Sequence, residues 1–157
     1  MKKVLISLII VMSVILAGGS FLLYRSIQPH SRARRDTIAF VSERTSLQEA
    51  QDFFWYNGEE TFLTVTGINE EGVERIYIVQ QDGGQILSLS KENTLSKEQA
   101  IQMTKESRQP DRILNARIGM QDDTPIWEIS YRNQNNRLGY FIIDLRTGEW
   151  IRTIDNI

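Results

Sequence analysis

The chain opens with a long apolar run. Val4 to Tyr24 contains no charged residue. A helix of that length rises about 30 Å, which matches the thickness of the hydrocarbon core of a bilayer. Lipid offers no hydrogen-bond partner to the backbone, so a spanning segment has to be helical. The pattern predicts a membrane anchor over residues 1–25, which contacts the bilayer through residues 4–24 and has a short polar tail before it.

A cleaved signal peptide is the alternative to an anchor. Ala17-Gly18-Gly19 supplies small residues behind a basic start, as a cleavage site would. The apolar run continues through Phe21–Tyr24, past that position, and this extra length favours an uncleaved anchor. Counting basic residues on each side leans toward a cytoplasmic soluble part. The basic residues counted are Lys2 and Lys3 before the run and Arg25, Arg32, Arg34 and Arg35 after it.

The rest of the chain contains an internal repeat at an offset of 64 residues. Apolar runs and turn residues of the segment that starts at Phe62 recur in the segment that starts at Ile126. Asn69 corresponds to Asn133 in one turn, and Gly84 corresponds to Gly148 in the next. A fixed period of this kind indicates two copies of one structural module. We call them the first repeat, residues 26–91 with the juxtamembrane segment, and the second repeat, residues 92–157.

Each repeat has the pattern of a helix followed by strands. The first helix is expected over Arg32–Leu47. The second is expected to begin after Ser96, an N-cap residue with Gln99 as its capping-box partner. Alternation in Phe62–Thr66 and Ile126–Ser130, and apolar segments between turn residues elsewhere, predict four strands in each repeat. These are Asp52–Tyr56, Phe62–Thr66, Arg75–Gln80 and Gln85–Leu89, then Ile113–Gly119, Ile126–Ser130, Gly139–Asp144 and Glu149–Ile154. The fold class is therefore α+β, with each helix packed on an antiparallel sheet of three to four strands.

The run Phe53–Tyr56 is apolar on both faces of its strand. One face is expected to cover the helix of the first repeat. The other face needs either the second repeat or a partner protein. We favour the second repeat, since a module of about 60 residues is only marginally stable alone.

The amino-acid composition excludes most catalytic mechanisms. The chain has no cysteine and a single histidine, His30, so thiol catalysis, disulfides, histidine triads and histidine clusters for zinc are excluded. Residues 36–157 hold twelve basic and twenty acidic residues, which gives a net charge of −8. A region of that sign repels polyanions, and we expect no nucleic-acid binding.

The remaining candidates for chemistry have simpler explanations. The paired carboxylates Glu59-Glu60, Glu70-Glu71 and Asp122-Asp123 lie in predicted turns, where they are solvated. A serine–lysine arrangement at Ser96-Lys97 is better explained by helix capping. Nucleotide-binding and hydrolase motifs are missing from the sequence. We therefore predict no catalytic, cofactor-binding or metal-ligating residue.

Three stretches resemble the TseB-like cell wall elongation regulators of Gram-positive bacteria. They are Leu95–Thr104, Ile126–Tyr131 and Phe141–Glu149, the last of which also resembles the end of a PepSY-type module. The resemblance implies two cystatin-like or PepSY-like modules outside a single-pass anchor whose N-terminus is cytoplasmic. It also implies a non-enzymatic regulator that binds a membrane-bound penicillin-binding transpeptidase or another wall-synthesis protein. The alternative is a PepSY-type inhibitor or chaperone of an exported peptidase.

Overall fold

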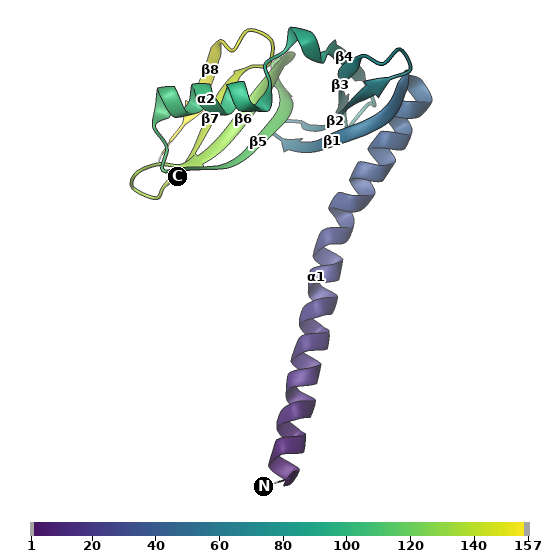
Figure 1. Ribbon diagram of the computed structural model, residues 1–157, viewed down its shortest axis with the longest axis vertical. Coiled ribbons are helices and arrows are strands. Elements are labelled where there is room, and N and C mark those ends of the chain that lie inside the picture. The colour runs from purple at the N-terminus through teal and green to yellow at the C-terminus, as the bar shows by residue number, and fades with distance from the viewer. Residues whose placement is uncertain (1, 156–157) are drawn as a thin grey trace. The chain divides into compact units, whose positions relative to one another are not determined.

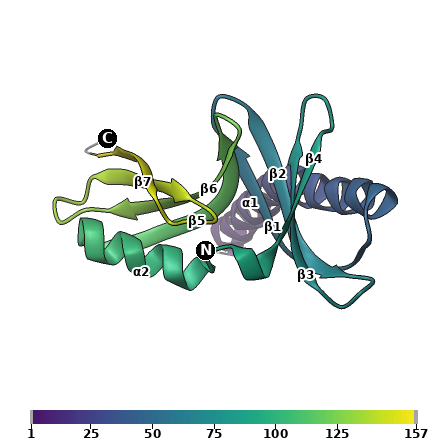
Figure 2. The ribbon, with the colours of Figure 1, turned by 90° about the horizontal axis from the view of Figure 1, so that it is seen from above.

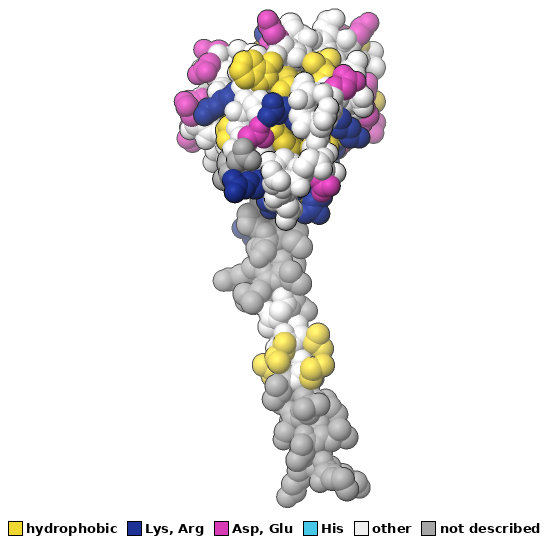
Figure 3. All heavy atoms as spheres, turned by 90° about the vertical axis from the view of Figure 1, so that its left-hand side faces the viewer, with side chains coloured by type: hydrophobic (Ala, Val, Ile, Leu, Met, Phe, Trp, Pro, Cys, Tyr) yellow, Lys and Arg dark blue, Asp and Glu magenta, His cyan; other side chains and the backbone are white. Residues whose placement is uncertain are grey.

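The computed structural model describes residues 2–155, which form two compact parts. One part ends at Asp36 and the other begins at Thr37. Helix α1, Lys2–Arg44, supplies the first part and continues into the second. Four apolar side chains in its first part are exposed, namely Met12, Val14, Ile15 and Leu16. Figure 3 shows hydrophobic side chains on one stretch of this helix.

Among the described residues, no helix combines the length and the hydropathy of a membrane span. Most side chains of the anchor expected over Val4–Tyr24 lie outside the described residues. The anchor and the limits 1–25, 26–91 and 92–157 therefore stay predictions.

The part from Thr37 onward contains two four-stranded antiparallel sheets of identical topology (Figures 1 and 2). The order in the first sheet is β1-β2-β3-β4, and the order in the second is β5-β6-β7-β8. The 3-10 helix η1 and helix α2 connect the two sheets. The predicted α+β class and the two repeats are confirmed. The bounds are β1 Leu47–Asn57, β2 Thr61–Asn69, β3 Glu74–Gln80, β4 Ile86–Ser90, η1 Lys91–Asn93, α2 Lys97–Arg108, β5 Arg112–Gln121, β6 Thr124–Arg132, β7 Leu138–Asp144 and β8 Trp150–Ile154.

The predicted first helix differs from α1 at both ends. The helix was expected over Arg32–Leu47, whereas α1 begins far upstream and ends at Arg44. The backbone N–H and the hydroxyl of Thr45 both donate to the Val41 carbonyl at 2.8 Å, which closes the last turn. Leu47 is 6% exposed and starts β1, because its side chain belongs to the core beneath the sheet.

Equivalent turns in the two repeats have the same hydrogen bonds. The Asn69 side-chain oxygen accepts from the backbone N–H groups of Glu71 and Val73 at 3.1 and 2.8 Å. The Asn133 oxygen accepts from Asn135 and Arg137, both at 3.0 Å. This side-chain turn is a common use of asparagine. The match at an offset of 64 residues therefore extends from the sequence to individual contacts.

The second pair of turns depends on glycine. Gly84 and Gly148 have φ values of 65° and 74°, in the left-handed region that favours glycine. Each glycine also lies against its own helix: a Cβ at Gly84 would lie 3.1 Å from the Phe40 ring, and one at Gly148 would lie 2.8 Å from the Met103 methyl group. The turn in each repeat thus allows the helix to pack closely on the sheet.

One face of the first sheet packs on the end of α1. Val41 and Val65 are fully buried there, and Tyr77 is 1% exposed. The Tyr77 hydroxyl is buried and has no hydrogen-bond partner among the described residues. A buried polar group without a partner lowers stability, because it has lost its hydrogen bonds to water.

Replacing Tyr77 by phenylalanine is therefore expected to raise the free energy of unfolding by up to about 1 kcal/mol. The change removes the unpaired hydroxyl and keeps the ring in the core. Urea denaturation of the full chain in detergent, followed by circular dichroism, measures the effect. A loss of more than about 1 kcal/mol would show that the hydroxyl has a stabilising contact.

The opposite face of the first sheet packs against the second repeat. Phe54 meets Trp127 edge to face, with ring centroids 5.7 Å apart, and Tyr56 is 5% exposed in the same core. The Thr64 hydroxyl donates to the Ile118 carbonyl at 3.3 Å across the contact. The prediction that the second repeat covers the apolar run Phe53–Tyr56 is confirmed, since Phe53 packs toward α1 and Phe54 and Tyr56 pack toward the second repeat.

Candidate functional site

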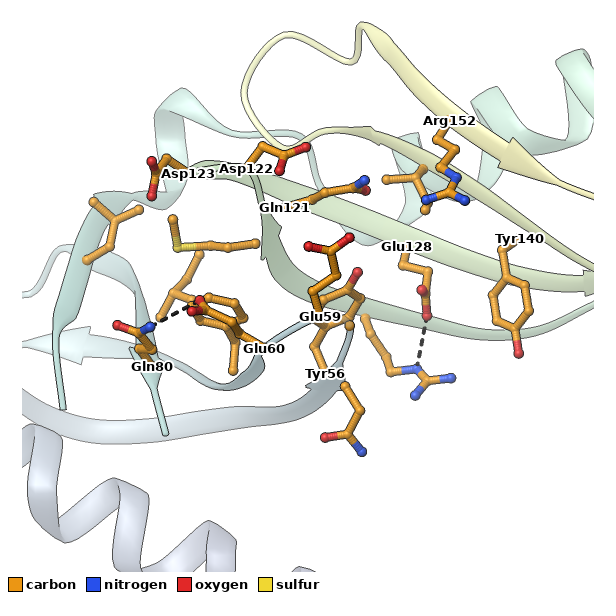
Figure 4. A pocket seen from close by; sticks show the side chains of 18 of the residues that line it. Tyr56, Glu59, Glu60, Gln80, Gln121, Asp122, Asp123, Glu128, Tyr140 and Arg152 are labelled. Carbon is orange, nitrogen blue, oxygen red and sulfur yellow. Dashed lines mark hydrogen bonds and ion pairs between the residues drawn. The ribbon is translucent and has the colours of Figure 1, made fainter. Parts of the chain in front are cut away.

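A groove with a volume of about 900 Å³ opens between the two repeats of the part that begins at Thr37. Residues of both hairpin turns, β1–β2 and β5–β6, line it together with one face of the second sheet. Figure 4 shows the acids of these turns on one side of the groove and Arg152 and Tyr140 on the other. The groove therefore exists only because the two repeats pack together.

An ion pair lies at the base of the groove. Arg117 in β5 and Glu128 in β6 are direct cross-strand partners. Arg117 Nε lies 3.6 Å from Glu128 Oε1, which is an ion-pair distance but too long for a good hydrogen bond. The Arg117 Nε atom is buried without a hydrogen-bond acceptor among the described residues. Among the described residues, the hydrogen-bonding capacity of the pair is thus only partly used.

Burial shifts the pKa of two groups in the groove, Glu128 and Tyr56. Burial raises the pKa of the Glu128 carboxyl, and the nearby Arg117 guanidinium opposes that shift without cancelling it. Burial also raises the pKa of Tyr56, and the negative charge of Glu128 adds to the effect. A further cation or hydrogen-bond donor in the groove would therefore stabilise the ionised form of Glu128.

The raised pKa of Glu128 predicts a pH-dependent effect of the substitution Glu128→Gln. The unfolded chain releases the Glu128 proton at a lower pH than the folded chain, so this residue lowers stability as pH rises through its folded pKa. We expect Glu128→Gln to be more stable, relative to wild type, at pH 8 than at pH 4. The difference should be about 1 kcal/mol or less, because the side chain is partly solvated.

Urea denaturation at the two pH values measures this difference, and Glu149→Gln, which replaces an exposed carboxylate, is the matched control. The same stability difference at pH 4 and pH 8 would contradict the burial effect.

Comparison of the two repeats shows how the groove face differs from its counterpart. In the first sheet, the side chains of Phe54, Thr64, Ile78 and Leu87 form one row across the four strands in register. The corresponding row in the second sheet is Arg117, Glu128, Ile142 and Arg152. Phe54 and Thr64 of the first row contact the second repeat, while Ile78 and Leu87 line the groove together with every member of the second row. At three of the four positions the second row has a charged residue where the first row has an uncharged one.

Two of the three predicted acidic pairs meet at this groove. Glu59 and Glu60 come from the β1–β2 turn, Asp122 and Asp123 come from the β5–β6 turn, and all four are exposed. Glu60 accepts a hydrogen bond from the Gln80 amide at 3.0 Å. The third pair, Glu70-Glu71, lies in the β2–β3 turn and is not part of the lining.

Arg117, Glu128 and Arg152 were not predicted as site residues. A signal existed, since Glu128 is the one charged residue in the segment Ile126–Tyr131 and stands where the first repeat has Thr64. Only the pairing of the strands shows that these three charges share one open face.

A second polar cluster holds the C-terminal end of the described residues against α2 and β6. The Asp155 carboxylate accepts hydrogen bonds from Arg108 at the end of α2 and from the Tyr131 hydroxyl in β6. Burial and the hydrogen bond to Asp155 raise the pKa of Tyr131. This cluster connects a helix end, a central strand and the residue after β8. Its three residues therefore have a structural role.

The other candidates also have structural roles or lie apart from the groove. Ser96 Oγ accepts from the Gln99 backbone N–H at 3.1 Å, and the Gln99 side chain accepts from the Ser96 N–H at 2.7 Å, so the predicted capping box is confirmed. His30 is exposed in the part that ends at Asp36. Within residues 2–155, no group of three or more metal-ligating side chains was found.

The fold and the groove define a class: a tandem α+β protein with an acidic groove between its repeats. Residues 36–80, from the end of α1 through β3, match the cell wall elongation regulator TseB-like domain. This match confirms the expected resemblance to that family over residues 36–80.

The YpmB protein from Bacillus subtilis shares this fold, with a TM-score of 0.70 at 19% sequence identity. The similarity covers 77% of this chain and 95% of that chain. At this identity the likeness establishes the fold. No curated protein matches the chain.

Proposed function

We propose that the chain regulates cell wall elongation by binding a penicillin-binding transpeptidase, or another wall-synthesis protein, at the cell membrane. The TseB-like domain at residues 36–80 is the observation that carries this proposal. The regulator acts without catalysis of its own. Its groove presents carboxylates and an ion pair, which suit binding to another protein.

The proposed placement is a single-pass anchor with a cytoplasmic N-terminus and both repeats outside the membrane. The uncharged run Val4–Tyr24 and the exposed apolar side chains of α1 support the anchor. The family resemblance supports this orientation, against the count of basic residues on each side of the run. The net charge of −8 over residues 36–157 disfavours close contact of the repeats with anionic headgroups or wall polymers. A protein partner is thus favoured over a polymer.

Cross-linking in intact cells, followed by purification and identification of the attached proteins, tests the function. We expect a wall-synthesis enzyme among the partners and altered cell width or length on deletion. An exported peptidase as the partner, together with unchanged cell shape, would favour the inhibitor or chaperone alternative. Protease treatment of intact cells tests the placement, since the repeats should be digested without permeabilisation.

A further inference from the structure

The groove carries a net charge that selects its occupant. Five carboxylates and two guanidinium groups line it, which leaves a net charge of −3. Such a surface attracts a cationic partner and discriminates against anionic ones. The carboxylates are Glu59, Glu60, Asp122, Asp123 and Glu128, and the guanidinium groups are Arg117 and Arg152.

The groove is also lined by apolar side chains from both repeats. They are Phe62, Ile78, Ile86 and Leu87 from the first repeat and Met120, Ile142 and Ile154 from the second. Ile86, Leu87, Met120 and Ile154 are only half-buried in the chain. An occupant that covers them and meets the carboxylates has to carry apolar and basic groups together.

The strands that line the groove favour an occupant with an extended backbone. Leu87 belongs to β4 and Ile154 belongs to β8, and each of these strands is the last in its sheet and pairs with one neighbour only in the described chain. Edge strands present N–H and C=O groups to which an extended segment can add. The volume of about 900 Å³ lies near the upper end for ligand clefts and suits a short peptide segment.

We propose that the groove binds an extended segment of a partner protein in which apolar residues alternate with lysine or arginine. The basic side chains meet the carboxylates of the two hairpin turns and Glu128, while the apolar side chains cover Met120 and Ile154. The identity of the partner as a wall-synthesis protein rests on the proposed function, whereas peptide binding by the groove does not.

The probe is a fluorescent octapeptide of alternating leucine and lysine, measured by anisotropy. The full chain is held in phosphatidylcholine nanodiscs, which carry no net charge, and empty nanodiscs give the background. The test variant neutralises the exposed acids with Glu59→Gln, Glu60→Gln, Asp122→Asn and Asp123→Asn. The matched control variant neutralises four exposed acids outside the groove with Glu70→Gln, Asp82→Asn, Glu92→Gln and Glu149→Gln.

Wild type and the control variant should bind the peptide alike, and the test variant should bind it about tenfold more weakly at low salt. A peptide with glutamate in place of lysine should not bind, and one with serine in place of leucine should bind more weakly. Circular dichroism confirms that both variants fold, which the exposure of all eight substituted side chains leads us to expect.

Three results would overturn the proposal. Equal weakening by both variants would show a general attraction to an acidic protein. Unchanged binding by the test variant would place the peptide elsewhere. Self-association of the wild type, measured by sedimentation and lost in the test variant, would assign the groove to a second copy of the chain.

Recovery of the cross-linked partner separates this proposal from the proposed function. If wild type captures a wall-synthesis enzyme and the test variant captures it equally, the function stands and the groove assignment fails. If wild type captures no such enzyme but binds the peptide with the expected variant pattern, the groove assignment stands and the wall-synthesis role fails.

Discussion

Trp127→Ala is expected to lower the free energy of unfolding by about 3–5 kcal/mol, the largest loss that we expect from a single substitution in this chain. Trp127 is 3% exposed and meets Phe54 of the first repeat edge to face. Its indole N–H donates to the Leu95 carbonyl at 2.9 Å, just before α2. Truncation would therefore leave a cavity between the repeats and an unsatisfied carbonyl at the start of a helix.

Trp150 provides the matched control for this prediction. It is 62% exposed on β8, so Trp150→Ala should change stability by less than about 0.5 kcal/mol. Urea denaturation of the full chain in detergent, followed by circular dichroism, compares the two variants. Similar losses for Trp127→Ala and Trp150→Ala would contradict the packing of the repeats through Trp127.

Gly119→Ala is the second substitution with a large expected effect, a loss of about 2–3 kcal/mol. A Cβ at Gly119 would lie 2.3 Å from the Tyr56 ring, closer than any real contact. Tyr56 is 5% exposed between the repeats, so its ring has little room to move. The added methyl group would push β5 away from the first sheet. It would thereby disturb the groove, which β1 and β5 both help to line.

A second substitution tests this explanation. In a Tyr56→Ala background the obstructing ring is absent, and Gly119→Ala should cost much less than it does alone. Leu114→Ala on the same strand is the control, since that side chain is 43% exposed and should change little. Equal costs of Gly119→Ala with and without the Tyr56 ring would rule out the clash as the cause.

The sequence predicted the repeat and the local structure because these depend on short-range patterns. Short apolar segments, alternating or continuous, mark all eight strands between turn residues, and Ser96 with Gln99 fixes the start of α2. The turns at Asn69 and Asn133 were recognisable from residue type, since asparagine hydrogen-bonds to the backbone nearby. The end of α1 was predicted three residues too late, because the core contact of Leu47 outweighs its helix preference.

The sequence by itself determined a duplicated helix-and-sheet module, its acidic charge and its lack of cysteine and of histidine pairs, all of which are local or compositional properties. Only the tertiary structure decided which side chains of the run Phe53–Tyr56 pack on the second repeat, and that Arg117, Glu128 and Arg152 face an open groove. Glu59 and Asp122 are 63 residues apart in the sequence, and they share one groove because strand pairing and sheet packing join distant segments. Burial of Glu128, and hence its raised pKa, follows from the same long-range contacts.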